Sequence, residues 1–290
     1  MVFSSQLFLF YFLPIALLLY YFSFPAWRNL TLTVASYAFY GWASPFYLVL
    51  IAWSTLVDYC CGNLIGGYWR LIGTVTVDAK GDRRASEAQR RLFLAVSLAS
   101  NIGLLLFFKY FAFFQENLNS AYEGLGYQGT EILKILLPVG ISFYTFESIS
   151  YSVDIYQGNA RPALAWVIGE GGGPPRSAWG RLLAEAKAMV AFACYITQFP
   201  HLVAGPIIRY QDLEGQIHLR THDATKFSAG VYFFALGLAK KVLIANPISE
   251  IADAAFHAGR LHWLDAWYGI VAYAFQIYFD FSGYFYCIHS

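Results

Sequence analysis

The sequence has 290 residues, of which 58% are hydrophobic and only 13% are Asp, Glu, Lys or Arg, and its mean hydropathy is +0.47. Soluble domains carry about 25% charged residues, so this chain has too little charge to cover a water-soluble globule. Its net charge of +1 excludes nucleic-acid binding through a concentrated basic face. The four cysteines form neither a CxxC pair nor a zinc-finger spacing with histidine, so they indicate neither a redox motif nor a structural metal site. No metal and no bound cofactor are expected.

Apolar stretches long enough to cross a bilayer begin near the N-terminus, since a spanning helix needs about 20 mainly apolar residues. The first 27 residues contain no charged group, whereas a secretory signal peptide has a basic start, so residues 6–22 are predicted to be a retained span. Residues 29–57 are also uncharged, and turn-forming residues around Pro45 predict two spans, near 29–43 and 46–67, with a tight turn between them.

Charged loops predict the orientation of these spans. Residues 68–91 contain six Lys or Arg side chains against three acids, and the positive-inside rule makes this loop cytoplasmic. A span at 92–114, an acidic outward loop reaching Glu131 and a returning span at 132–156 follow. The next loop contains three arginines and is cytoplasmic by the same rule, which leaves the N-terminus outside.

The C-terminal half contains one interrupted apolar stretch and two continuous ones. Residues 188–208 lack Asp, Glu, Lys and Arg, but Pro200 and Pro206 interrupt them, which predicts a broken or re-entrant helix lining a cavity. Further apolar segments cover 227–249 and 263–288. The fold class predicted is an all-α multi-pass membrane protein with about seven or eight hydrophobic segments, forming a single membrane domain over residues 1–290.

Ionisable residues inside a span cost about 2.5 to 3.5 kcal/mol each, so each one requires a partner or a water-filled cavity. Glu147 and Asp154 are seven residues apart and are expected on one face of a helix. They could form a polar wall of a reaction chamber together with neighbouring hydroxyl side chains. They could equally belong to a hydrogen-bonded seam where two helices pack.

Three further places in the apolar segments could bind a ligand or take part in chemistry. His201 could act as a base or a hydrogen-bond donor, although backbone carbonyls freed by the nearby prolines could also satisfy it. Lys240 and Lys241 are expected to extend towards a membrane interface rather than to bind substrate. Asp280 is a candidate functional acid, with a structural helix cap at Ser282 as the alternative.

His218 and His222 have the i, i+4 spacing of a helical metal site. Two histidines without a third ligand are weak evidence, so a polar surface helix is the preferred interpretation.

Four segments of the sequence resemble the membrane-bound O-acyltransferase family, and the resemblance is closest to its bacterial alginate O-acetylation branch. They are the opening Met-Val-Phe-Ser-Ser-Gln-Leu-Phe-Leu-Phe, the segment from Ser142 to Gly158, Phe199-Pro-His-Leu-Val-Ala-Gly-Pro206, and Tyr278-Phe-Asp-Phe-Ser-Gly-Tyr284. They occur in the order found in the family, which makes the set more specific than any one segment.

The resemblance implies a ring of transmembrane and re-entrant helices around a funnel. It implies transfer of acetyl groups, from acetyl-CoA or a related acyl thioester, to hydroxyls of an exported polysaccharide such as alginate. The expected partners are the lipid bilayer, the polysaccharide acceptor and periplasmic or extracellular acetylation proteins, and the expected location is the inner membrane. Candidate pocket residues are Glu147, Asp154, His201, Asp280 and Ser282.

The resemblance also places the catalytic histidine of the family in an Arg-x-Trp-His type segment beyond Ser290. We therefore expect a truncated and inactive chain, in which His289 does not replace the missing base because it lies one residue from the end. Alternative functions are a membrane transporter or channel component, indicated by the charged residues in apolar surroundings, or a non-catalytic membrane scaffold.

Overall fold

A computed structural model describes residues 5–43, 45–72, 74–77, 83–124, 137–169, 177–202 and 207–288. The chain divides into two compact units. The first contains Met1–Ser23, Pro200–Pro206 and Arg220–Ser290, and the second contains Phe24–Phe199 and Ile207–Leu219. Each unit is described by itself.

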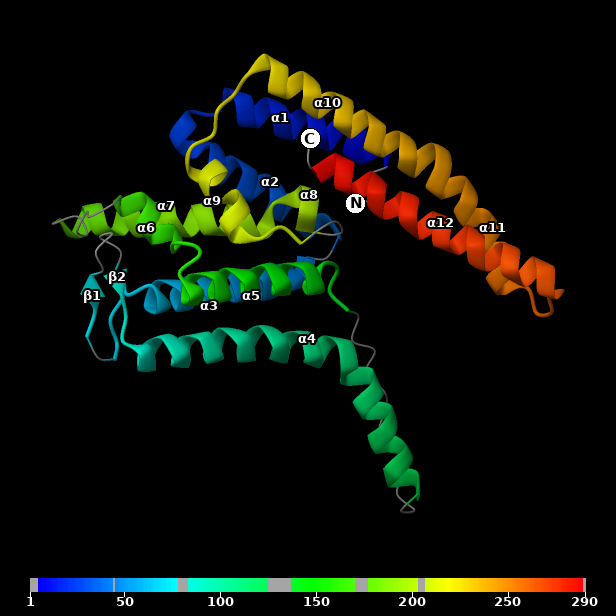
Figure 1. The fold of residues 1–290 in the computed structure, drawn as a ribbon, viewed down its shortest axis with the longest axis horizontal. Coiled ribbons are helices and arrows are strands. Elements are labelled where there is room, and N and C mark those ends of the chain that lie inside the picture. Colours follow the sequence, from blue (N-terminus) through cyan, green and yellow to red (C-terminus); the bar gives the residue numbers. More distant parts are fainter. Residues whose placement is uncertain are drawn as a thin grey trace. The chain divides into compact units, whose positions relative to one another are not determined.

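The second unit is built almost entirely from helices (Figure 1). Its elements are η2 (Pro25–Trp27), α2 (Arg28–Ala43), η3 (Pro45–Tyr47), α3 (Leu48–Ile65), β1 (Thr76–Val77), β2 (Arg83–Arg84), α4 (Glu87–Gly124), α5 (Ile141–Gln157), α6 (Ala163–Ile168), α7 (Ala178–Thr197) and α9 (Tyr210–His218). Helices α3, α4 and α5 contact one another pairwise, and α7 packs against α2, α3 and α5. The expected all-α class is therefore correct except for the two-residue antiparallel pairing of β1 with β2.

Helix α4 carries polar side chains on its buried face and apolar side chains on its exposed face. Its buried residues are Gln89, Ser97 and Asn101, whereas Leu92 and Leu106 are nearly half exposed. Water-soluble proteins have the opposite arrangement. This distribution fits a helix whose outer surface meets lipid, because hydrocarbon favours apolar side chains and polar groups must find partners inside the protein.

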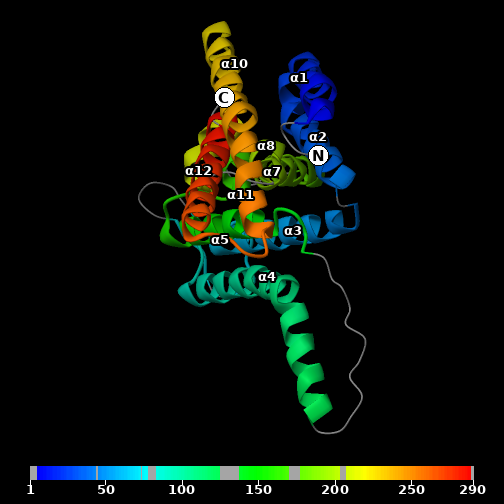
Figure 2. The same ribbon diagram turned by 90° about the vertical axis from the view of Figure 1, so that its right-hand side faces the viewer.

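The first unit contains a short helical stretch at the N-terminus and longer helices from the C-terminal part of the chain, and the latter pack side by side. Its elements are η1 (Phe8–Phe12), α1 (Leu13–Phe22), α10 (Ala224–Ala239), η4 (Lys240–Ala245), α11 (Asn246–His257) and α12 (Trp263–Ile288). Helix α10, the π-helical turn η4 and α11 follow one another without a break, and all three pack along α12 (Figure 2). The short helix α8 (Phe199–Leu202) lies at the boundary between the two units in the sequence.

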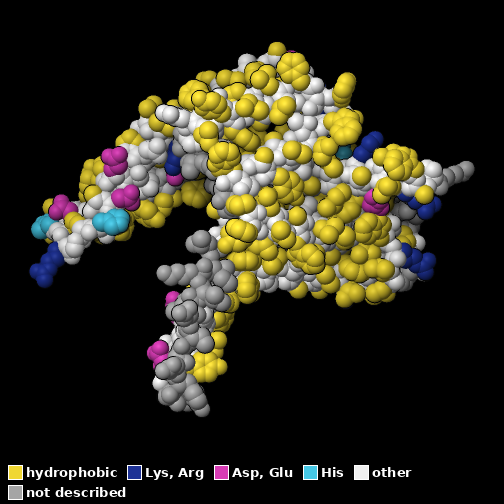
Figure 3. Space-filling view, turned by 180° about the vertical axis from the view of Figure 1, so that it is seen from behind, with side chains coloured by type: hydrophobic (Ala, Val, Ile, Leu, Met, Phe, Trp, Pro, Cys, Tyr) yellow, Lys and Arg dark blue, Asp and Glu magenta, His cyan; other side chains and the backbone are white. Residues whose placement is uncertain are grey.

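The helical membrane class predicted from the sequence is confirmed. Within the described residues, three stretches are long and apolar enough to cross a membrane, namely Pro45–Ile65, Glu87–Gly124 and Ala224–His257, and Phe8–Phe22 is a shorter apolar helix. A wide hydrophobic surface covers the helices, as Figure 3 shows.

Two predicted boundaries differ from the structure. The outward loop expected after residue 114 is wrong over its first part, because α4 continues to Gly124 and includes Glu116 and Glu123. The remainder of that loop, up to Glu131, lies outside the described residues, and the returning helix α5 begins only at Ile141, after Pro138.

Candidate functional site

A buried carboxylate lies between α3, α4 and α5, where sequence reasoning had singled out no residue. Asp58 of α3 is fully buried. Ser97 Oγ donates to its Oδ1 at 2.6 Å, Asn101 Nδ2 lies 2.9 Å from both of its oxygens, and Ser54 Oγ lies 3.3 Å from Oδ2. Ser97 also bonds Ser152 of α5 at 2.8 Å, so the network joins three helices. Hydroxyl and amide groups thus surround a carboxylate that would otherwise be too costly to bury.

Glu147 and Asp154 lie on the buried face of α5, as their spacing predicted. Asp154 forms an ion pair with Arg209, the residue directly before α9. The guanidinium compensates the buried carboxylate and fixes the end of α5 to the start of α9. Glu147 is fully buried on the same face of α5, and the hydroxyl residues Thr145 and Ser148 of this helix are buried too.

Helix α7 breaks where the prolines predicted it would. It ends at Thr197, Gln198 has an extended backbone with ψ of 115°, and the buried N–H of Phe199 donates to Ser36 Oγ of α2 at 3.1 Å. His201 then lies in α8 and is 2% exposed, which agrees with its expected burial. Residues 203–206, including Pro206, lie outside the described part of the chain.

After this break the chain returns towards the end of α5. Tyr195 Oη, near the end of α7, donates to the carbonyl oxygen of Ile208 at 2.9 Å, and the next residue, Arg209, pairs with Asp154. The described part of the second unit thus contains a helix that ends and a segment that comes back beside it. This supports the predicted broken or re-entrant helix.

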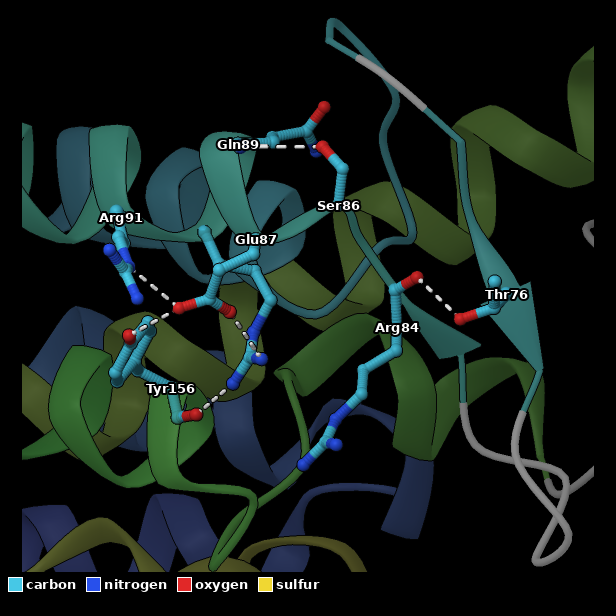
Figure 4. Close-up of polar contacts among 8 residues, drawn as sticks. Thr76, Arg84, Ser86, Glu87, Gln89, Arg91 and Tyr156 are labelled. Atoms are coloured by element: carbon cyan, nitrogen blue, oxygen red, sulfur yellow. Dashed lines mark hydrogen bonds and ion pairs between the residues drawn. The ribbon is translucent and has the colours of Figure 1, made fainter.

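Arginine side chains gather where α4 begins and α5 ends (Figure 4). Glu87 pairs with Arg90 at 3.1 Å and Arg91 at 2.7 Å and accepts from Tyr156 Oη at 2.9 Å. Arg90 also donates to the carbonyl oxygen of Tyr156 and lies over its ring, with 4.7 Å from Cζ to the centroid. These cations lie at the C-terminal end of α5, where the helix dipole favours positive charge.

Gln89 and Glu185 bond the segment that follows α3, residues 69–72, near this arginine-rich end. Gln89 is buried and makes four hydrogen bonds to backbone groups, accepting from the N–H groups of Leu71 and Ile72 and donating to the carbonyls of Leu64 and Trp69. Glu185 of α7 accepts from Tyr59 Oη at 2.6 Å and Trp69 Nε1 at 2.8 Å.

Near the same end, Glu214 of α9 accepts from the N–H of Arg161 and from Trp166 Nε1, each at 3.3 Å. Burial raises the pKa of the Glu214 carboxyl above its ordinary value.

In the first unit, Lys240 and Lys241 both reach towards α12. Lys241 Nζ lies 2.6 Å from Asp280 Oδ1, and Lys240 Nζ donates to Ser282 Oγ at 2.9 Å. Lys240 Nζ also lies 3.7 Å from the centroid of the Tyr286 ring. Asp280, Ser282 and Tyr286 thus give both ammonium groups polar or aromatic partners within the first unit, and their extension to a membrane interface stays a prediction.

The partner of Asp280, the candidate functional acid, is the cation of Lys241. The alternative helix cap at Ser282 is wrong, because α12 continues from Trp263 to Ile288 and Ser282 lies inside it. Close packing of Gly237 against Gly283 brings the two helices together, since a Cβ on Gly237 would lie 2.5 Å from the carbonyl oxygen of Gly283.

His218 and His222 do not share a helix, so the expected polar surface helix carrying both is wrong. Helix α9 ends at His218, whose ring stacks on Trp166 with centroids 5.2 Å apart. His222 Nε2 lies 2.8 Å from Tyr20 Oη in the first unit. No group of three or more His, Cys, Asp or Glu side chains suited to a metal occurs among the residues that the structure describes.

The structure therefore divides the predicted pocket residues into two groups. Glu147 and Asp154 belong to the second unit, and Asp280 and Ser282 to the first, as does His201. Each group is set in apolar helices and contains buried or half-buried charged side chains with specific partners. A helical membrane protein with polar helix contacts and long apolar outer faces is the class that the fold and these contacts define.

Comparison with known proteins gives the family. The model of the membrane-bound O-acyltransferase family matches residues 124–288. The chain belongs to this family.

Its relatives include the probable alginate O-acetylase AlgI of Pseudomonas aeruginosa, which is 41% identical over 284 residues, covering 98% of this chain and 47% of that protein. The corresponding protein of Pseudomonas putida is 40% identical over 284 residues, covering 98% of this chain and 51% of the relative. The peptidoglycan O-acetyltransferase of Helicobacter pylori is 31% identical over 299 residues, covering 98% of this chain and 52% of the relative. The chain thus spans about half the length of the curated relatives it matches. No solved structure matches it.

Proposed function

We propose that the whole protein is an O-acetyltransferase that moves acetyl groups from a thioester donor towards hydroxyl groups of an exported cell-surface polysaccharide such as alginate. The observation that carries the proposal is the 41% identity to a probable alginate O-acetylase across 98% of this chain. Because the chain spans about half the length of that relative, the proposal concerns the activity of the whole protein.

Transfer of an acetyl group to a hydroxyl requires a base for the hydroxyl proton and stabilisation of the charge that develops on the carbonyl oxygen. For this chain we assign positioning roles rather than proton transfer. The residues with these roles are Glu147 and Asp154 in the second unit and His201, Asp280 and Ser282 in the first. Ionisable side chains inside a membrane protein are energetically costly, so they are retained mainly where they have a function or a specific partner. This supports the assignment.

The Lys241–Asp280 pair has the clearest positioning role in this proposal. It fixes the segment Tyr278–Tyr284 of α12 against the π-helical turn η4, and the hydrogen bond from Lys240 to Ser282 adds a second connection. π-helical turns are rare and are frequent at functional sites. We infer that the two contacts set the orientation of this segment of α12 within the first unit.

The proposed location is the inner membrane, with the N-terminus outside and residues 68–91 in the cytoplasm. The arginines at the start of α4 support this orientation, since Lys and Arg are enriched in cytoplasmic loops. Acetyl-CoA or a related thioester would then reach the protein from the cytoplasm. The acceptor polysaccharide and the proposed acetylation partners would lie on the outer side.

The test is complementation in a host that makes alginate but lacks its own alginate O-acetylase. The complete gene product containing these residues is expressed in that host, and ester-linked acetate on the purified polymer is measured by NMR. We expect acetate to return with the wild-type protein and to fall strongly with Asp280→Asn, which removes the anion opposite Lys241.

The matched control is Lys226→Met, which removes an exposed lysine of α10 whose Nζ bonds Thr221. This variant should restore acetate as the wild-type protein does. If the wild-type protein is inserted in the membrane at normal levels and neither alginate nor peptidoglycan gains acetate, the proposed function is wrong.

A further inference from the structure

Helix α4 is much longer than a bilayer requires. Its 38 residues extend about 57 Å at 1.5 Å per residue, whereas roughly 30 Å of hydrocarbon is crossed by about 20 residues. Residues 92–108 contain no charged group between Arg91 and Lys109. A crossing that begins after Arg91 is therefore complete near Phe111, and the rest of the helix is not needed to cross the hydrocarbon and lies at or beyond the membrane boundary.

The second part of α4 also stops packing against the other helices of its unit. Asn101 is the last buried residue of α4, and every described residue from 102 to 124 is exposed or half-exposed. Phe108 still contacts the ring of Tyr47, with centroids 5.9 Å apart. Beyond it the helix turns away from the line of its first part (Figures 1 and 2).

This second part has two distinct faces. Apolar and aromatic side chains recur every three or four residues and form what we call the aromatic stripe, made of Phe107, Tyr110, Phe111, Phe114, Leu118 and Tyr122. The opposite face, which we call the polar stripe, contains Lys109, Glu116, Asn119, Ser120 and Glu123, and Phe113 is the one aromatic residue beside Lys109 and Ser120 on this side. Spacing of this kind places each set on one side of an α-helix.

The aromatic stripe is too apolar to lie in water without cost. Phe114 is 61% exposed and Leu118 is 58% exposed. Each large apolar side chain gains about 1.5 to 3 kcal/mol when it is removed from water. Because the helix reaches the bilayer boundary directly before this segment, the nearest apolar surroundings are the lipid chains at that boundary. Tyrosine, which the stripe contains at positions 110 and 122, is also enriched in this layer.

We propose that the part of α4 beyond its crossing, residues 112–124, forms an interfacial helix that lies along the membrane boundary, with its part of the aromatic stripe against the lipid chains and its part of the polar stripe in water. The lipid surface is the partner of this segment. The boundary is the one away from the arginine-rich end of the unit, because that end lies at the start of α4 and the segment lies beyond its crossing. The proposal does not depend on acyl transfer.

The test measures which stripe contacts lipid in the complete protein in native membranes. Cysteines are introduced singly as Glu116→Cys and Glu123→Cys on the polar stripe and as Phe114→Cys and Leu118→Cys on the aromatic stripe. Membranes are opened so that both sides meet a membrane-impermeant maleimide. The unsubstituted protein gives the background from Cys60, Cys61, Cys194 and Cys287, which are buried or half-buried.

We expect the two polar-stripe cysteines to be labelled and the two aromatic-stripe cysteines to resist labelling until the membrane is dissolved in denaturing detergent. Equal labelling of both stripes would overturn the proposal, because the helix would then stand in water. Loss of labelling on both stripes would also overturn it, because the segment would then cross the membrane or lie under protein.

A spin label at Leu118→Cys distinguishes lipid from a protein partner as the cover of the aromatic stripe. Contact with lipid gives strong relaxation by oxygen and weak relaxation by a water-soluble nickel complex, and this is the expected result. Weak relaxation by both reagents would show that another protein or a second copy of this chain covers the stripe, and would overturn the proposal.

Discussion

The amide nitrogen of Asn101 lies 2.9 Å from both carboxylate oxygens of Asp58, and both side chains are buried between α3 and α4. An amide that bonds both oxygens holds the carboxylate of α3 against α4. Ser97 and Ser54 supply the remaining hydrogen bonds, so the acid is held by neutral donors. This pair therefore defines how α3 and α4 are aligned.

Replacing Asn101 with leucine should destabilise the protein by about 1 to 2 kcal/mol, because the buried carboxylate loses a donor that serves both oxygens. Unfolding in detergent with increasing denaturant measures the change. The matched control is Asn117→Leu, an exposed asparagine on the same helix whose amide bonds the Phe113 carbonyl, and it should have a much smaller effect. Equal losses for the two variants would contradict a special role for the Asp58 network.

The Lys241–Asp280 pair should show energetic coupling. Lys241→Met and Asp280→Leu each leave one charge in apolar surroundings, whereas the double variant removes both. The double variant should therefore lose less stability than the sum of the single variants, by about 1 kcal/mol. The denaturation assay in detergent gives all three values, and simple additivity would show that the two side chains do not stabilise one another.

Gly237→Ala should disrupt the packing of α10 against α12. The added Cβ would lie 2.5 Å from the Gly283 carbonyl oxygen and 2.8 Å from Cys287 Sγ, so the helices must separate at a cost of about 1 to 3 kcal/mol. Gly103→Ala is the control, because nothing lies within 4 Å of its new Cβ and alanine is the better helix former. The melting temperature in detergent should fall for the first variant and stay level or rise for the second. A melting temperature that falls for Gly103→Ala and not for Gly237→Ala would exclude the close contact between Gly237 and Gly283.

The orientation of the second unit can be tested with thiols at its two ends. Arg84→Cys lies on β2 at the arginine-rich end, and Glu123→Cys lies on the polar stripe of α4. An impermeant maleimide should label Arg84→Cys only in inverted vesicles and Glu123→Cys only in intact spheroplasts, because basic segments stay in the cytoplasm. Labelling of both variants from one side would contradict the proposed topology.

Sequence reasoning found the helical membrane class, the break after α7 and the burial of Glu147, Asp154 and His201. It did not single out Asp58, although this is the one charged residue between Arg28 and Arg70. A lone acid in such a long uncharged stretch was the available signal. Its donors are distant in sequence, since Ser97 is 39 residues away, and no local pattern pairs them.

The lysine contacts could not be predicted for a different reason. Successive side chains on an α-helix point about 100° apart, so adjacent lysines are not expected to meet the same neighbouring helix. Lys240 and Lys241 both reach α12 at the start of the π-helical turn η4, and such a turn has no recognised sequence signature here. The length of α4 was missed because Glu116 and Glu123 were interpreted as loop residues, whereas they lie on one face of a continuing helix.

Transfer of acetyl groups tests the central claim most directly. Inverted inner-membrane vesicles carrying the complete gene product are supplied with radiolabelled acetyl-CoA and with alginate and the acetylation proteins of the host enclosed inside. We predict that alkali-labile radioactivity accumulates on the enclosed polymer and is greatly reduced with Asp280→Asn. Vesicles that contain the protein in normal amounts, yet transfer no label to polymer or to any enclosed protein, would contradict its assignment as an O-acetyltransferase.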